Sequence, residues 1–260
     1  MLLVKQRLIF ILDSLKEKLV FETFRKSKVD EVGRFFDSAL QKNELAVFYL
    51  DVSGFIIRSV NQAVLIDPAG MLKDDEVNAL KAVKLVLFTH DHLDHFSSGK
   101  TEAIFKATAA SVLAEAKVAG KLKGKIPADK LVSAEDGKTY SLGGVNAAAI
   151  QGIHRGPIIL YQLRMDGVTL FHGGDSGYVS LRDYSSQVAI VPVGRMSPTA
   201  SPENAYKMVA DLKPDVAITM HGSDKQKQEF ERKVKEAMPQ TTVLIMAPFT
   251  SKSLSVPQKP

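Results

Sequence analysis

The sequence has 260 residues, and its 34 Lys and Arg against 29 Asp and Glu give a formal net charge of +5 with His neutral. Hydrophobic residues make up 45% and charged residues 24%, which is typical of a globular protein and excludes a disordered chain. There is no cysteine, which excludes disulfide frameworks, zinc ribbons, iron–sulfur clusters and cysteine nucleophiles. The basic excess is compatible with an anionic substrate, although solvated lysine side chains explain it more simply.

Residues 1–44 predict an N-terminal helical extension. Val4, Leu8 and Leu12 recur at helical spacing with charged residues between them, and a second helix is expected over residues 32–40. The apolar stripe of the first helix needs a partner. We therefore expect the extension to pack on the body of the protein or on a second copy of the chain, which would give a homo-oligomer.

The N-terminal apolar stretch does not predict a secretory leader. Lys5 and Arg7 interrupt it, and no small-residue cleavage site follows. No apolar run approaches the roughly 18 residues of a membrane helix. We expect a cytoplasmic protein with no membrane association.

Residues 45–250 alternate short apolar runs with turn signals, a pattern that predicts strands mixed with helices. Helices are expected at residues 101–119, 202–212 and 225–237, and residues 251–260 are expected to form a frayed tail. Strands are expected at residues 45–50, 54–57, 63–66, 84–88, 145–150, 158–163, 168–171, 188–193, 216–219 and 242–246.

Three of the six histidines fall in one stretch, where His90 to His95 read His-Asp-His-Leu-Asp-His. The stretch follows a predicted buried strand, and α/β proteins place ligands at such strand ends. Imidazole and carboxylate groups suit zinc, iron or manganese. We expect His90 and His92 to face one metal ion, and Asp94 and His95 to face a second. Asp91 is expected to be a turn or helix-capping residue.

Three further ligand-type residues, His154, Asp175 and His221, each follow a predicted strand. Strand ends that gather at one edge of a sheet would bring all three to the histidine cluster. His172 lies three residues before Asp175, and we expect it to be a buried supporting residue and not a ligand.

The order of these residues resembles the metallo-β-lactamase superfamily of metal-dependent hydrolases. The resemblance covers about residues 45–250 and implies an α+β fold, a four-layer αβ/βα sandwich with the site at one edge of two sheets. The family pattern is an early Asp, then His-x-His-x-Asp-His, a lone His, a lone Asp and a final His. Here these positions are Asp67, His90, His92, Asp94, His95, His154, Asp175 and His221.

The resemblance implies two divalent cations, with zinc expected and manganese or iron as alternatives. It assigns His90, His92 and His154 to the first cation, and Asp94, His95 and His221 to the second.

Four single residues receive further roles. By resemblance, Asp175 would bridge the two cations, and Asp67 would orient the cluster loop. Asp94 is a candidate to take and return a proton. Arg195 follows a predicted strand end, where it either binds a substrate anion or forms a surface salt bridge.

Gly-Gly-Asp-Ser-Gly around Asp175 resembles the branch that contains ascorbate-6-phosphate lactonase. That branch often has a His where this sequence has Val52. The expected function is hydrolysis of a small-molecule ester, lactone or phosphate ester by metal-activated water. A nuclease or phosphodiesterase of the same superfamily and a non-catalytic metal-bound scaffold are the alternatives. Nucleic acid is the less favoured partner, because this length leaves no room for a long inserted RNA-gripping domain.

Overall fold

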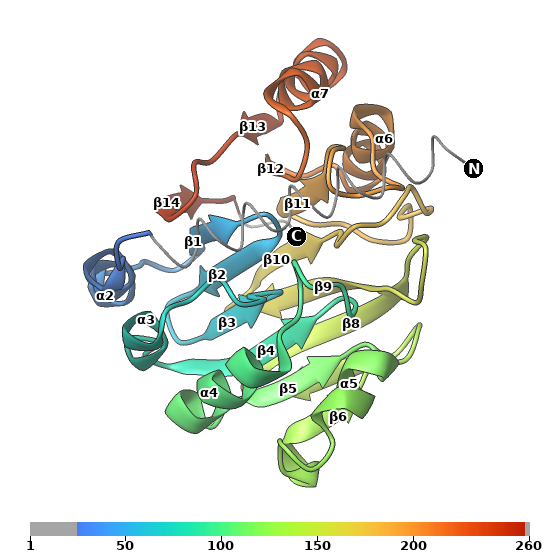
Figure 1. Ribbon diagram of the computed structural model, residues 1–260. Coiled ribbons are helices and arrows are strands. Elements are labelled where there is room, and N and C mark those ends of the chain that lie inside the picture. The colour runs from blue at the N-terminus through green and yellow to red at the C-terminus, as the bar shows by residue number, and fades with distance from the viewer. Residues whose placement is uncertain (1–24, 258–260) are drawn as a thin grey trace.

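The computed structural model describes residues 25–257, which form two stacked β-sheets covered by helices on both outer faces (Figure 1). The four-layer α+β sandwich expected from the sequence is therefore confirmed. The first predicted helix falls within residues 1–24 and lies outside the described residues. The second runs from Val29 to Asp37 as α2, a few residues earlier than expected.

Within residues 25–257, the first sheet has seven strands in the order β14-β1-β2-β3-β4-β5-β6. Four helices, α2 to α5, accompany these strands along the chain. The elements are α2 Val29–Asp37, β1 Glu44–Asp51, β2 Gly54–Arg58, β3 Ala63–Ile66, α3 Asp74–Asn78, β4 Val83–Phe88, α4 Ser98–Thr108, β5 Ser111–Ala114, α5 Ala116–Leu122, a short 3-10 helix at Ala128–Lys130, β6 Leu131–Ser133 and, near the end of the chain, β14 Thr250–Ser255.

The second sheet also has seven strands in the described part of the chain, in the order β13-β12-β11-β10-β9-β8-β7. Figure 1 shows α6 and α7 beside the β11 to β13 half of this sheet. The elements are β7 Thr139–Leu142, β8 Val145–Gln151, β9 Ile159–Met165, β10 Val168–His172, β11 Val188–Pro192, α6 Pro202–Leu212, β12 Val216–Met220, α7 Asp224–Ala237 and β13 Thr242–Leu244.

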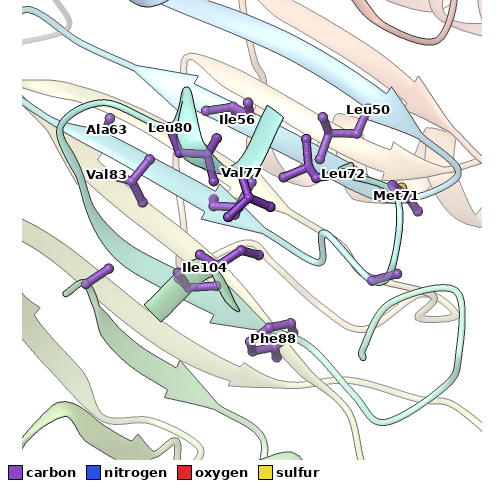
Figure 2. Close-up of a cluster of buried hydrophobic side chains, with 14 of the residues drawn as sticks. Leu50, Ile56, Ala63, Met71, Leu72, Val77, Leu80, Val83, Phe88 and Ile104 are labelled. Atoms are coloured by element: carbon purple, nitrogen blue, oxygen red, sulfur yellow. The ribbon is translucent and has the colours of Figure 1, made fainter. Parts of the chain in front are cut away.

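Three buried apolar clusters match the three boundaries between the four layers. The outer cluster joins α2 to α5 to the first sheet, the central cluster joins the two sheets, and a third joins α6 and α7 to the second sheet. Figure 2 shows part of the outer cluster, with Val77 of α3 between Ile56 of β2 and Ile104 of α4. Because successive strand residues point to opposite faces, β1 gives Phe48 to the outer cluster and Val47 to the central one.

The helices of the second half begin where the sequence signals them. Ser201 accepts a 3.1 Å hydrogen bond from the backbone N–H of Asn204, and Pro202 occupies the first turn of α6, where its missing N–H costs nothing. Ser223 and Gln226 form a reciprocal capping box at the start of α7. The helix predicted over residues 202–212 is confirmed with the same bounds.

The helix predicted over residues 101–119 is wrong, because a strand interrupts it. α4 ends at Thr108, the residue after it, Ala109, has a left-handed φ of 52°, and β5 follows in parallel with β4. Val112 packs in the outer cluster and Leu113 in the central one. The burial of β5 on both faces of the sheet therefore outweighs the helix propensity of the alanine-rich sequence.

The frayed tail predicted over residues 251–260 is wrong for residues 251–255. These residues belong to β14, which pairs antiparallel with β1 from Glu44 opposite Ser255 to Tyr49 opposite Thr250. Only Leu254 of this strand is buried. An exposed, polar edge strand lacks the apolar alternation by which a strand is recognised in a sequence.

The described part of the N-terminal extension is joined to the body by a buried ion pair. The Arg25 guanidinium contacts both carboxylate oxygens of Glu76 at 2.5 Å and donates to the carbonyl of Met71 at 2.7 Å. It also lies 3.9 Å from the centre of the Phe249 ring. The segment before α2 is thereby fixed to α3 and to the loop before β14.

No helix among residues 25–257 has both the length and the apolar character needed to cross a lipid bilayer.

Candidate metal centre

Four strand ends deliver the predicted ligands to one edge of the two sheets. His90 follows β4, His154 follows β8, Asp175 follows β10 and His221 follows β12. The side chains of these residues meet in two groups of possible metal-ligating atoms, and the atoms of each group lie within 4.8 Å of one another. The first group is His90, His92, His154 and Asp175, and the second is Asp94, His95, Asp175 and His221.

Asp67 organises the loop that carries the histidine cluster. It has a left-handed φ of 44° just after β3, and its side chain is fully buried. Its carboxylate accepts hydrogen bonds from the backbone N–H of Thr89 at 2.8 Å and from the Thr89 hydroxyl at 2.6 Å. It also contacts Nδ1 of His95 at 2.8 Å. Asp67 therefore fixes both the start of the loop and the orientation of one ring.

These contacts assign the tautomers of three rings. The Thr89 hydroxyl donates to Asp67, so at 3.0 Å it accepts the Nδ1–H of His90. His95 donates its own Nδ1–H to Asp67. The Thr199 hydroxyl donates to the carbonyl of Asp175 at 2.7 Å and so accepts the Nδ1–H of His154 at 3.0 Å. His90 and His154 are thereby left with an unprotonated Nε2, the form that a metal ion binds, and His95 presents its Nε2 to Asp175.

The buried atoms at the centre have no hydrogen-bond partners among the described residues. These atoms are Nε2 of His90, Nε2 of His95, both ring nitrogens of His221 and Oδ1 of Asp175. Buried polar atoms are rarely left without partners, because such atoms lose their hydration without compensation. The Asp175 oxygen lies 2.6 Å from Nε2 of His221 and 3.1 Å from Nε2 of His95. This convergence of imidazole nitrogens on a carboxylate fits the donor set of a divalent cation.

The electrostatics of the centre favour a cation. Burial lowers the pKa of His90 and of His154, so both rings are neutral at neutral pH. Burial works against ionisation of Asp175, but His221 and His95 outweigh it and hold its pKa well below its ordinary value. Burial also opposes a charged His95, and Asp175 and Asp67 raise its pKa well above normal. A metal ion would take the place of that ring's proton.

Close backbone approach shapes the loop after β10. Gly174 has a φ of 48°, and a Cβ there would lie 3.1 Å from both Thr89 and Ile158. Any side chain at this position would therefore push Asp175 away from the cluster loop. His221 also has a left-handed φ, 54°, and its backbone N–H donates to the carbonyl of Val52.

Two residues that the sequence analysis set apart from the ligands belong to neither group. Asp91 forms an ion pair with Lys121 at 2.8 Å. His172 is fully buried and donates Nε2–H to the carbonyl of Ser53, while its Nδ1 accepts the N–H of Gly174. The burial of His172 lowers its pKa to about 4, which keeps the ring neutral.

Arg195 lies in the exposed loop after β11, beside the loop that carries His221. Its backbone N–H donates to Gln226, and its carbonyl accepts from the N–H of Gly222. Its assignment to a substrate anion stays a prediction.

Sequence reasoning missed three hydroxyl residues that hold the ligands. Thr89 and Thr199 fix two of the histidine tautomers, as described above. The Ser53 hydroxyl donates to the carbonyl of Asp94 at 3.0 Å. Ser and Thr are too common for their type alone to identify them, although Thr89 could have been noticed as the residue between a strand and the first ligand.

Replacing Asp67 with Asn is expected to weaken metal binding by about 10- to 100-fold, the usual effect of losing a residue that orients a ligand. Asn keeps the size of the side chain but cannot accept all three hydrogen bonds as a charged group. The dissociation constant is measured by competition with a chelating dye. Asp74, whose side chain is 93% exposed, supplies the matched control Asp74→Asn. An equal loss in both variants would show that Asp67 has no special role.

The family comparison agrees with the fold. The model for the β-lactamase superfamily domain matches residues 46–221. A UPF0173 protein of Pyrococcus abyssi is 31% identical over 173 residues, which cover 64% of this chain and 78% of that relative. A UPF0173 metal-dependent hydrolase of Aeropyrum pernix is 29% identical over 241 residues, which cover 78% of this chain and 95% of that relative.

Solved structures show the same fold. A metallo hydrolase from the archaeon Ignicoccus hospitalis has a TM-score of 0.67 at 22% identity, with 81% of this chain and 98% of that chain covered. The metallo-β-lactamase fold protein YhfI from Bacillus subtilis has a TM-score of 0.66 at 11% identity, with 82% of this chain and 100% of that chain covered.

The fold and the two ligand groups define the class of metal-dependent hydrolases. Within that class the chain belongs to the metallo-β-lactamase superfamily, as its sequence pattern indicated.

Proposed function

We propose that this protein hydrolyses a small-molecule ester, lactone or phosphate ester, using two divalent cations held by the two groups of ligands. The observation that carries the proposal is the set of buried ring nitrogens that converge on Asp175 without hydrogen-bond partners among the described residues. A purely structural cluster of histidines would satisfy these atoms with neighbouring donors and acceptors.

The seven ligand-type residues divide between the two cations, and Asp175 is common to both groups. Five of the six other ligands are histidines, a donor set that suits zinc, and the carboxylates of Asp94 and Asp175 leave manganese or iron as alternatives. The division is His90, His92 and His154 for the first cation, and Asp94, His95 and His221 for the second.

Bound cations would polarise the scissile carbonyl or phosphoryl group and lower the pKa of a water molecule to about 7. The residues of the chain then orient and move protons. Ser53 holds the backbone of Asp94, so the partly exposed Asp94 carboxylate stays beside His95 and His221. From there Asp94 can accept the proton of the attacking water and return it to the leaving oxygen. Asp67, Thr89 and Thr199 keep the imidazoles in the ligating tautomer.

A hydrolysis panel tests this proposal. The purified protein is stripped by a chelator, reloaded separately with zinc, manganese or ferrous iron, and assayed on carboxylic esters, lactones, phosphate monoesters and phosphodiesters. We expect reloaded protein to hydrolyse at least one class, and the rate to fall to background on chelation and return on reloading. A rate that survives complete removal of metal would overturn the proposal, as would a fully loaded protein that hydrolyses none of the classes.

A further inference from the structure

A cavity of about 810 Å³ lies on the side of the cluster loop near α3 and α4. Its volume falls in the range of small-molecule sites, roughly 300–1,000 Å³. The cavity shares Asp94 with the second ligand group, and Asp91 and Leu93 of the same loop also line it. A molecule that reacts at the metal centre can therefore extend into this cavity.

The floor of the cavity is apolar. Met71, Leu72 and Phe96 line it and are also members of the outer buried cluster, and Figure 2 shows Met71 and Leu72 near one another in that cluster. At the loop, Leu93 is 72% exposed, the largest exposure among the large hydrophobic residues of the described chain. Exposing an apolar side chain beside a site is unfavourable in water, and a bound apolar group would remove that cost.

The charges of the cavity are largely balanced within it. Lys100 pairs with Asp74 at 2.9 Å, and Lys121 pairs with Asp91 at 2.8 Å. These four residues all line the cavity, so two of its three lysines are already paired with its own carboxylates. An anion entering here would have to compete with these pairs. A neutral apolar group would lie on the floor without disturbing them.

We propose that this cavity binds the acyl chain of the substrate, so that the preferred substrates are carboxylic esters with acyl chains of several carbons. The inference rests on the proposed hydrolytic function and names a substrate class for it. In the reaction the acyl carbon–oxygen bond breaks, water supplies the oxygen of the new acid, and the leaving oxygen takes a proton to become an alcohol.

Two variants alter the cavity, and each has a matched control. Leu93→Ser removes the exposed apolar wall, and Val60→Ser makes the same change at a 45% exposed residue in the β2–β3 turn. Gly70→Leu fills the cavity, because a Cβ at Gly70 would meet no atom within 4 Å. Gly99→Leu is its control, since Gly99 is equally open but does not line the cavity.

The first measurement is kcat/KM of metal-loaded protein for p-nitrophenyl acetate, butyrate and octanoate. For the wild type we expect kcat/KM to rise by about three- to fourfold for each added methylene that the cavity buries. Leu93→Ser should reduce that rise and Gly70→Leu should abolish it beyond butyrate, with metal content unchanged. Val60→Ser and Gly99→Leu should behave as the wild type.

The second measurement separates the cavity from the reaction. Binding of acetate, butyrate and octanoate to metal-loaded protein is measured by calorimetry, and the same chain-length dependence and the same loss in Gly70→Leu are expected. If no ester is hydrolysed while octanoate binds in this way, the cavity assignment stands and ester hydrolysis falls. If esters are hydrolysed but octanoate binds no tighter than acetate, or Gly70→Leu keeps the full dependence, the cavity assignment is overturned and the proposed hydrolysis stands.

Discussion

Asp175→Ala is expected to lose both metal ions and to reduce hydrolysis by about 10³-fold or more, since enzymes owe accelerations of at least roughly 10⁶-fold to their catalytic groups. Asp175 is common to both ligand groups, so its removal takes one ligand from each group and the single negative charge that the two groups share. The loop after β10 should keep its conformation in this variant, because the backbone carbonyl of residue 175 would still accept hydrogen bonds from the Ser197 and Thr199 hydroxyls, both 2.7 Å long in the wild type.

Metal content and turnover are measured together for this variant and for His172→Asn. His172 lies only three residues earlier and is equally buried, but it contacts Ser53 and Gly174 and belongs to neither ligand group. We expect His172→Asn to retain its metal and to lose at most about 10- to 100-fold in activity. Retention of both ions in Asp175→Ala, together with their loss in His172→Asn, would refute the assignment of ligands after β10.

Glu76→Ala is expected to lower the free energy of unfolding by about 3–5 kcal/mol, the usual cost of removing one partner of a buried ion pair. The Glu76 side chain is fully buried, and the Arg25 guanidinium would be left without its carboxylate. The backbone N–H groups of Lys28 and Lys73 would also lose their acceptor. Urea unfolding followed by circular dichroism measures the change.

Glu236→Ala is the matched control, because Glu236 pairs with Arg232 on the exposed face of α7 and such pairs contribute about 1 kcal/mol or less. The difference in the free energy of unfolding between the wild type and Glu76→Ala should also depend on pH. Burial opposes ionisation of Glu76, but the hydrogen bonds from Arg25 and from the two backbone N–H groups lower its pKa below the ordinary 4.5. Its contribution is thus present above that ordinary value and is lost as the pH falls through the lowered pKa. Equal losses of unfolding free energy in Glu76→Ala and Glu236→Ala would show that the buried ion pair of Glu76 does not stabilise the protein more than an exposed pair does.

Much of the fold could be predicted from the sequence, because most strands are short apolar runs bounded by turns. β3 and α6 were predicted with the bounds that the structure shows. The failures have physical causes. β5 lies within an alanine-rich stretch whose helix propensity its pairing with β4 outweighs, and β14 is a polar edge strand held by its hydrogen bonds to β1.

The ligand-type residues could be predicted because three histidines and two aspartates crowd residues 90–95, and because three further candidates each follow an apolar strand in the order that the superfamily shows. The structure brings all seven together. The residues that orient them could not be predicted, since Thr89 and Thr199 act through single hydroxyl contacts that depend on the folded loops. The cavity beside Asp94 was equally inaccessible, because its walls come from four separate parts of the chain, 51–52, 69–74, 91–100 and Lys121.

Anomalous diffraction from crystals of the zinc-loaded protein, collected on both sides of the zinc absorption edge, shows directly whether the two ligand groups hold two cations. We predict two zinc peaks per chain, one among His90, His92 and His154 and the other among Asp94, His95 and His221, with Asp175 in contact with both. No zinc at these residues in fully loaded protein, or zinc bound only elsewhere, would show that the two ligand groups are not a metal centre.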